Sequence, residues 1–98
     1  MTAAVLLLAP EDDVAVALRR LEPGEPIEAG GHRLTVCETI PFAHKVALHA
    51  LEAGARVRKF GVPIGRTTAA VATGAHVHVH NLASDYIKNA SMFFEEDA

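Results

Sequence analysis

Hydrophobic and polar residues alternate with a period of two in two short segments of the chain. These are RVRKFG, residues 56–61, and HVHVHN, residues 76–81. Because successive side chains of an extended strand point to opposite faces, the alternation predicts two β-strands. A third region, EPIEAGGHRLTVCETI, places Gly30 and Gly31 between two short β runs, which predicts a hairpin turn.

The chain also repeats part of its own sequence. VALRRLEPGEPI, residues 16–27, and VALHALEAGARV, residues 46–57, share V, A, L, L, E and G, and RTTAAVATGAHV, residues 66–77, is a weaker third copy. The common pattern is L-x-x-G-x-x-V, which suits a tight turn with glycine at positive φ leading into a strand. Residues 44–53 are also good helix formers that end before Gly54, so a helix is the alternative there. We favour the turns, and a mostly β fold with strands of about five residues.

Composition narrows the class of protein. The 98 residues suit one domain, and half of them are apolar with few aromatics, so the core is expected to consist of Val, Leu, Ile and Ala. A net charge of −3 without clustered Lys and Arg excludes a phosphate-backbone binder, and no nucleic-acid partner is expected. The acidic residues 11–13 and 95–97 are interpreted as solvated.

Two further features concern the compartment. Cys37 is the only cysteine, so neither an intrachain disulfide nor a cysteine zinc cage can form, and we expect a small core residue. The apolar run near the N-terminus is too short to span a bilayer and lacks the preceding basic region of a signal peptide. The simplest interpretation is a cytoplasmic protein without membrane association.

Three motifs then occur in a fixed order: HKVAL at residues 44–48, FGVPIG at 60–65 and HVHNL at 78–82. Together they resemble the SAF domain, a β-clip fold found at the front of altronate and galactarate dehydratases and as the small subunit of sulfolactate sulfo-lyase. The resemblance implies one mostly β, β-clip domain over residues 1–83, with room for one or two short helices, and a C-terminal tail over 84–98.

The chain departs from the family pattern at three positions. Ala43 stands where members commonly carry Gly, Phe60 where Tyr is common, and Thr67 where Ala is usual. The change at Phe60 removes a phenol that could form a hydrogen bond near the site.

The histidines of HVHVHN are candidate metal ligands. Residues two apart on a strand share one face with about 7 Å between Cα atoms, so neighbouring members can converge on one ion. His76 occupies a position that the family does not hold as His, so His78 and His80 are the predicted ligands. The resemblance favours Fe²⁺, although Zn²⁺ or Mn²⁺ would also suit imidazoles. The alternative is an amphipathic strand with its valines in the core and its histidines in water.

Other candidates surround this pair. Asn81 is predicted to orient an imidazole or to bind a substrate hydroxyl. His44, at the head of HKVAL, is the third predicted catalytic residue beside His78 and His80. Lys45 and Lys59 are predicted to hold a substrate carboxylate, with plain surface charge as the alternative. His32 and His49 lie outside the motifs and are expected to face solvent.

The resemblance implies the small subunit of a hydro-lyase that acts on sugar acids. Such an enzyme removes the proton α to a carboxylate and eliminates a β-hydroxyl as water, with a metal stabilising the enediolate-like charge. This chain is too small to supply the whole site, so we expect a large dehydratase-type subunit to complete it and the chain to be inactive alone.

Two alternatives remain at this point: the small subunit of a sulfolactate sulfo-lyase, and a non-catalytic SAF module for binding or assembly. A homo-oligomer is also compatible with the sequence. The tail offers an apolar stripe that packs on its own domain or on another subunit. Its members are Tyr86, Ile87, Met92, Phe93 and Phe94.

Overall fold

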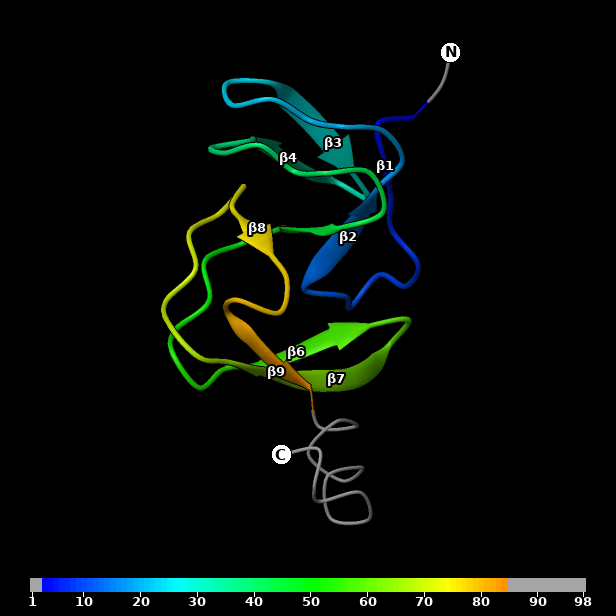
Figure 1. Cartoon of the computed structure of the whole chain (residues 1–98). Helices are drawn as coiled ribbons and strands as arrows, with labels where there is room; N and C mark the ends of the chain where they lie inside the picture. Colours follow the sequence, from blue (N-terminus) through cyan, green and yellow to red (C-terminus); the bar gives the residue numbers. More distant parts are fainter. Residues whose placement is uncertain (1–2, 85–98) are drawn as a thin grey trace.

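The computed structural model describes residues 3–84 as an all-β chain in which no helix occurs. The mostly β prediction is confirmed, whereas the helices for which it left room are absent from this range. Nine strands form three antiparallel sheets (Figure 1). They are β1 (Val5–Leu6), β2 (Val14–Ala17), β3 (Pro26–Ala29), β4 (His32–Thr35), β5 (Lys45–Ala47), β6 (Arg56–Lys59), β7 (Val62–Thr67), β8 (His76–Val77) and β9 (Leu82–Ser84).

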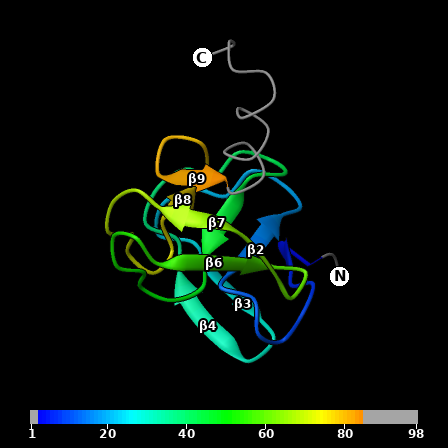
Figure 2. The same cartoon turned by 90° about the horizontal axis from the view of Figure 1, so that it is seen from below.

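The central sheet has the order β1-β2-β5-β8. The β3–β4 hairpin lies at one end of it and the β6-β7-β9 sheet at the other (Figure 1). Seen from below, β6, β7 and β9 lie side by side across that end (Figure 2). The β3–β4 hairpin turns at Gly30 and Gly31, both at positive φ, as predicted. The predicted tail begins at the end of β9 and otherwise lies outside the described residues.

The sequence repeat corresponds to a repeated turn. Residues 44–53 form no helix, because β5 is followed by bends and then by a bridge from Leu51 to Val71. The same turn also occurs where the pattern was not recognised, with Ala43 in the position of the glycine. The four residues at this position have φ between 73° and 89°: Gly24, Ala43, Gly54 and Gly74.

All four turns are hydrogen-bonded in one way. The residue at positive φ donates its N–H to the carbonyl of a facing residue, which donates back to the carbonyl of the next residue along the turn. Taken in the order of the turns at residues 24, 43, 54 and 74, the facing residues are Val36, Ala17, Thr67 and Ala47. The chain is therefore built from four copies of one hydrogen-bonded unit, where the sequence showed three.

The departure at Thr67 has a local explanation. Its side chain is buried, and its hydroxyl donates to the carbonyl of Glu52 at 2.6 Å and accepts from the N–H of Ala55 at 3.0 Å. A hydroxyl in this place ties β7 to the Gly54 turn, which an alanine side chain cannot do.

Small aliphatic side chains form the core, as composition predicted. It consists of two clusters in which Val36, Val46, Val57 and Val77 are fully buried. Cys37 was expected in the core, but it is exposed because its neighbour Val36 takes the inward position.

The interpretation of residues 11–13 as solvated is wrong for Asp12, which is 3% exposed. Its carboxylate accepts three backbone N–H groups, from Ala9 at 3.1 Å, Phe60 at 2.9 Å and Gly61 at 2.7 Å. Phe60 and Gly61 both have positive φ at the tip of the β6–β7 hairpin. Asp12 thus ties that hairpin to the loop before β2, since buried N–H groups require an acceptor.

Candidate active site

The register of the central sheet brings two of the motifs together. β5 pairs antiparallel with β8, with Lys45 opposite Val77 and Val46 opposite His76. Continuing this register by one pair places His44 opposite His78, and residues directly opposite in an antiparallel pair have adjacent side chains. HKVAL and HVHVHN therefore contribute to one site.

Three imidazoles are stacked in this site. The ring centroids of His44 and His78 lie 3.8 Å apart with 18° between the planes, and those of His44 and His76 lie 5.0 Å apart with 22°. His44 Nδ1 is 2.8 Å from His76 Nε2, so one of these nitrogens donates to the other. One ring nitrogen from each of the three residues lies within 4.8 Å of the other two.

The strand predicted over residues 76–81 is wrong beyond Val77. There the chain turns, with the Asn81 N–H donating to the carbonyl of His78 at 3.0 Å. The Asn81 side chain closes the turn: its Oδ1 accepts from the His78 N–H at 3.0 Å, and its Nδ2 donates to the His76 carbonyl at 2.8 Å. An asparagine that bonds nearby backbone groups competes with continued strand pairing, which explains the early end.

The turn leaves His80 exposed beside His76. His80 is exposed, and its ring centroid lies 5.0 Å from that of His76 with the planes tilted by 35°. It does not belong to the group of converging nitrogens formed by His44, His76 and His78. The ligand pair His78 and His80 therefore stays a prediction.

Burial and positive neighbours favour the neutral forms of His76 and His78. Burial lowers the pKa of His78, and His44, Lys45 and His80 lower it further. Burial likewise lowers the pKa of His76, with smaller contributions from the three other histidines, while Glu38 acts in the opposite direction. A neutral imidazole has a free lone pair on one nitrogen, which is the form that binds a metal.

Two hydrogen-bonding details complete the group. The carboxylate of Glu38 accepts the backbone N–H of His76 at 2.9 Å. The Nδ1 atom of His78 is buried, and no group within residues 3–84 is hydrogen-bonded to it. A buried polar atom without a partner is unusual and calls for a ligand, a water or an ion.

Lys45 follows His44 at the start of β5, and Lys59 ends β6. Lys45 is half-buried, and its pKa is lowered first by this burial and then by the positive charge of Lys59. The Lys59 ammonium lies 5.8 Å from the ring centroid of Phe60. Within the described part of the chain neither ammonium forms an ion pair with a carboxylate. Both cations are therefore available to an anionic ligand.

These residues fit a divalent transition metal. Three converging imidazole nitrogens suit Fe²⁺, Zn²⁺ or Co²⁺ better than Mg²⁺ or Ca²⁺, which prefer oxygen. His76 is the residue that sequence reasoning set aside. The β5–β8 register would have identified His76 as a candidate ligand, but the pattern of a single sequence does not reveal that register.

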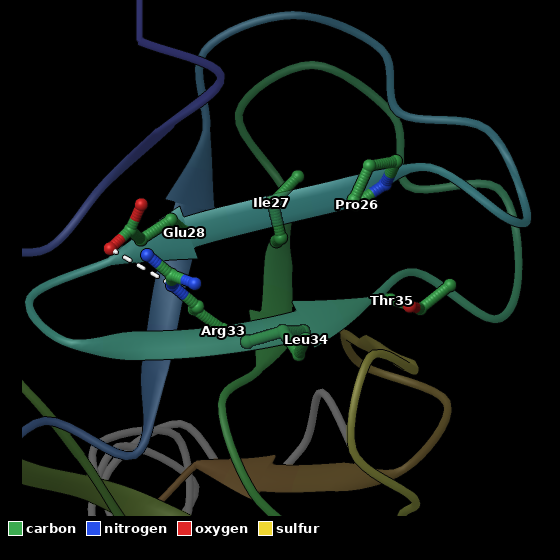
Figure 3. A pocket seen from close by; sticks show the side chains of 6 residues that line it. All are labelled: Pro26, Ile27, Glu28, Arg33, Leu34 and Thr35. Atoms are coloured by element: carbon green, nitrogen blue, oxygen red, sulfur yellow. Dashed lines mark ion pairs between the residues drawn. The ribbon is translucent and has the colours of Figure 1, made fainter.

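The two histidines outside the motifs lie away from this group. His49 is exposed and its Nε2 lies 2.8 Å from Asp13 Oδ1, and His32 is partly exposed in β4. An open depression of about 460 Å³ lies over the β3–β4 hairpin (Figure 3). An ion pair between Glu28 and Arg33 borders it, and none of the histidines lines it.

Comparisons with known proteins agree with the motifs. The family described as "Altronate/galactarate dehydratase SAF domain" matches residues 3–85. Altronate dehydratase of Bacillus subtilis is 37% identical over 71 residues, which is 72% of this chain and 14% of that enzyme. Altronate dehydratase of Escherichia coli is 41% identical over 70 residues, which is 71% of this chain and 14% of that enzyme. The chain thus spans about one seventh of the length of these two relatives.

A shorter relative matches more of its own length. The (2R)-sulfolactate sulfo-lyase subunit alpha of Paracoccus pantotrophus is 49% identical over 49 residues, which is 50% of this chain and 73% of that subunit. Both kinds of relative named by the sequence resemblance are therefore found. Because the family matches most of this chain, the chain belongs to the altronate/galactarate dehydratase SAF-domain family.

Proposed function

We propose that this chain is the SAF subunit of a cytoplasmic hydro-lyase that acts on a sugar acid, with a larger dehydratase-type chain completing the site. Two comparisons support this assembly. The altronate dehydratases match through about one seventh of their length, and the sulfo-lyase relative is itself named a subunit. On this proposal the chain is inactive alone.

The observation that carries the proposal is the charge of the site. Three converging imidazoles lie at β5 and β8 beside Lys45, whose pKa is lowered by burial and by the positive charge of Lys59. Within residues 3–84 neither lysine has an ion-pair partner. Such a surface favours a ligand with a carboxylate, because ammonium–carboxylate hydrogen bonds are charge-assisted. A polyhydroxy acid provides this group next to the hydroxyls that a dehydratase removes.

Each residue then has a proposed role. Lys45 and Lys59 hold the carboxylate, and Asn81 keeps the turn that presents His78. His80 is exposed beside the cluster, and we assign it the transfer of a proton to or from the substrate. His44 and His78 form the wall against which the acid lies. A bound divalent metal, with Fe²⁺ as our choice, would supply Lewis-acid stabilisation of the charge that develops next to the carboxylate.

The sulfo-lyase alternative keeps the same wall and changes the leaving group. It is favoured by the 49% identity to a sulfo-lyase subunit alpha, higher than the identities to the altronate dehydratases, although over fewer residues. Sulfolactate also carries a carboxylate that Lys45 and Lys59 would hold.

Reconstitution tests both candidates. The chain is combined with the large dehydratase-type chain encoded nearest to it, and turnover of altronate, galactarate and sulfolactate is measured with and without Fe²⁺. Lys45→Met and His80→Ala are expected to lower turnover by about tenfold or more, while His32→Ala leaves it unchanged. Failure of the two chains to associate, or equal small effects of all three substitutions, would contradict the proposal and leave a non-catalytic binding module.

A further inference from the structure

We propose that His44, His76 and His78 form a complete three-nitrogen site for one divalent transition-metal ion, so that this chain binds the ion without a partner chain. The inference replaces His80 of the predicted ligand pair with His44 and His76. The inference deepens the proposed function. It rests on that function only for the role of the metal in the reaction, and not for the binding of the metal.

Distances between the ring nitrogens support this set. With metal–nitrogen bonds of about 2.1 Å, ligand atoms around a tetrahedral or octahedral ion lie about 3.0–3.4 Å apart. His44 Nδ1 and His76 Nε2 are 2.8 Å apart, and one nitrogen of each of the three residues lies within 4.8 Å of the others. His44 and His76 are therefore already close to the spacing that one ion requires, and the His78 nitrogen lies within about 2 Å of that spacing.

The scaffold holds these rings from two directions. His44 directly precedes β5, and His76 begins β8 opposite Val46. His78 directly follows β8, where the side chain of Asn81 fixes the backbone at His76 and His78. Ligands carried by paired strands and a closed turn are positioned before the ion arrives, which lowers the entropic cost of binding.

The buried Nδ1 atom of His78 is an independent observation in favour of a ligand. It has no hydrogen-bond partner within the described residues, although most buried polar atoms have one. A metal on either nitrogen of this ring fixes its tautomer, and a protonated Nδ1 would then face a water or a group of the bound acid.

The nature of the donors defines the ion. Three imidazoles select a first-row transition metal over Mg²⁺ and Ca²⁺, and they leave coordination positions open on the side away from β5 and β8. Those positions suit the oxygens of a carboxylate and an adjacent hydroxyl. The same open positions would be filled by water in the chain without substrate.

The test titrates the purified full-length chain with Co²⁺, followed by its visible d–d absorption, and with Zn²⁺ by equilibrium dialysis. One ion per chain is expected, with Mg²⁺ unable to compete. His44→Gln, His76→Gln and His78→Gln should each weaken the affinity by more than about tenfold, because even outer-shell substitutions often reach that size. His80→Gln and His32→Gln are the matched controls and should leave it unchanged.

Circular dichroism shows which variants keep the wild-type fold. Should one of the three fail to fold, the wild-type chain still decides, because Zn²⁺ must shift the NMR signals of three imidazoles and leave those of His80 and His32 in place. The inference is overturned if the wild type does not saturate below about 1 mM metal, or if His80→Gln weakens binding as much as His76→Gln. Neither result affects association with the large chain, on which the proposed function is judged.

Discussion

Ala43 is the strained position of the repeated turn, and replacing it with glycine should stabilise the protein. Its φ is 73°, a region that alanine enters at a cost of about 1–2 kcal/mol, because its Cβ approaches the carbonyl. The three equivalent turns use Gly24, Gly54 and Gly74. Glycine removes the cost, but it also gives the unfolded chain about 0.4–1 kcal/mol more conformational entropy to lose.

The net effect follows from these two opposing quantities. Ala43→Gly is expected to raise the free energy of unfolding by about 0.5–1 kcal/mol. For a domain of this size the change corresponds to an increase in Tm of about 2–8 °C. Ala43 is exposed, so the loss of its methyl group removes little packing. Urea unfolding followed by circular dichroism measures the free energy, and a thermal scan measures the Tm.

Two substitutions in the equivalent turn provide matched controls. Ala53 is exposed and has no positive φ, so Ala53→Gly should lower the stability by about 0.5–1 kcal/mol. Gly54→Ala should lower it by about 0.5–1 kcal/mol through strain alone, because an added Cβ would meet no atom within 4 Å. If Ala43→Gly lowers the stability as Ala53→Gly does, Ala43 carries no strain and the equivalence of the turns is refuted.

Three further outcomes are expected. Asp12→Ala should cost about 3 kcal/mol in urea unfolding, from three hydrogen bonds of about 1 kcal/mol each, whereas Glu11→Ala on the exposed neighbour should change the stability little. Asn81→Ala should lower the free energy of unfolding by about 1–2 kcal/mol and weaken Co²⁺ binding, because two hydrogen bonds that fix the turn at His78 are lost. Unchanged Co²⁺ binding would mean that the turn does not position His78. Lys45→Met should strengthen Co²⁺ binding to the isolated chain, because it removes a positive charge near His78. The same substitution should raise the KM of the reconstituted pair for the acid. Equal losses in both assays would instead point to a folding defect.

Much of the fold could be predicted because it is encoded locally. The L-x-x-G-x-x-V repeat specifies a turn within seven consecutive residues, and the Gly30–Gly31 hairpin is specified by two adjacent residues. Ala43 escaped notice because alanine carries no turn signal, although tertiary hydrogen bonds with Ala17 hold it in the conformation of glycine. Asp12 escaped for a related reason: its three donors come from residues 9, 60 and 61, two of them distant in sequence.

The candidate site was predictable in part. His44 and His78 were singled out by motif, and the structure brings them into direct stacking. His76 was set aside because the family does not hold its position as His. The pairing of His78 with His80 assumed that the alternating segment stays extended, but the Asn81 side chain turns the chain after Val77. Pairing between segments 30 residues apart decides which rings meet, and a single sequence contains little information about that pairing.

The histidines meet where they do because of how the four turns are connected. The turns at Gly24 and Gly54 lead into β3 and β6, which pair with the strands that directly follow them, whereas the turns at Ala43 and Gly74 lead into β5 and β8, which pair with each other. Gly54→Ala should therefore lower stability and leave Co²⁺ affinity unchanged. Gly74→Ala should lower both, because its Cβ would lie 2.1 Å from the Thr35 carbonyl oxygen and force β8 to shift against β5. Urea unfolding and Co²⁺ titration of the two variants measure the contrast. Equal loss of affinity in both would show that the site depends on overall stability rather than on the β5–β8 register.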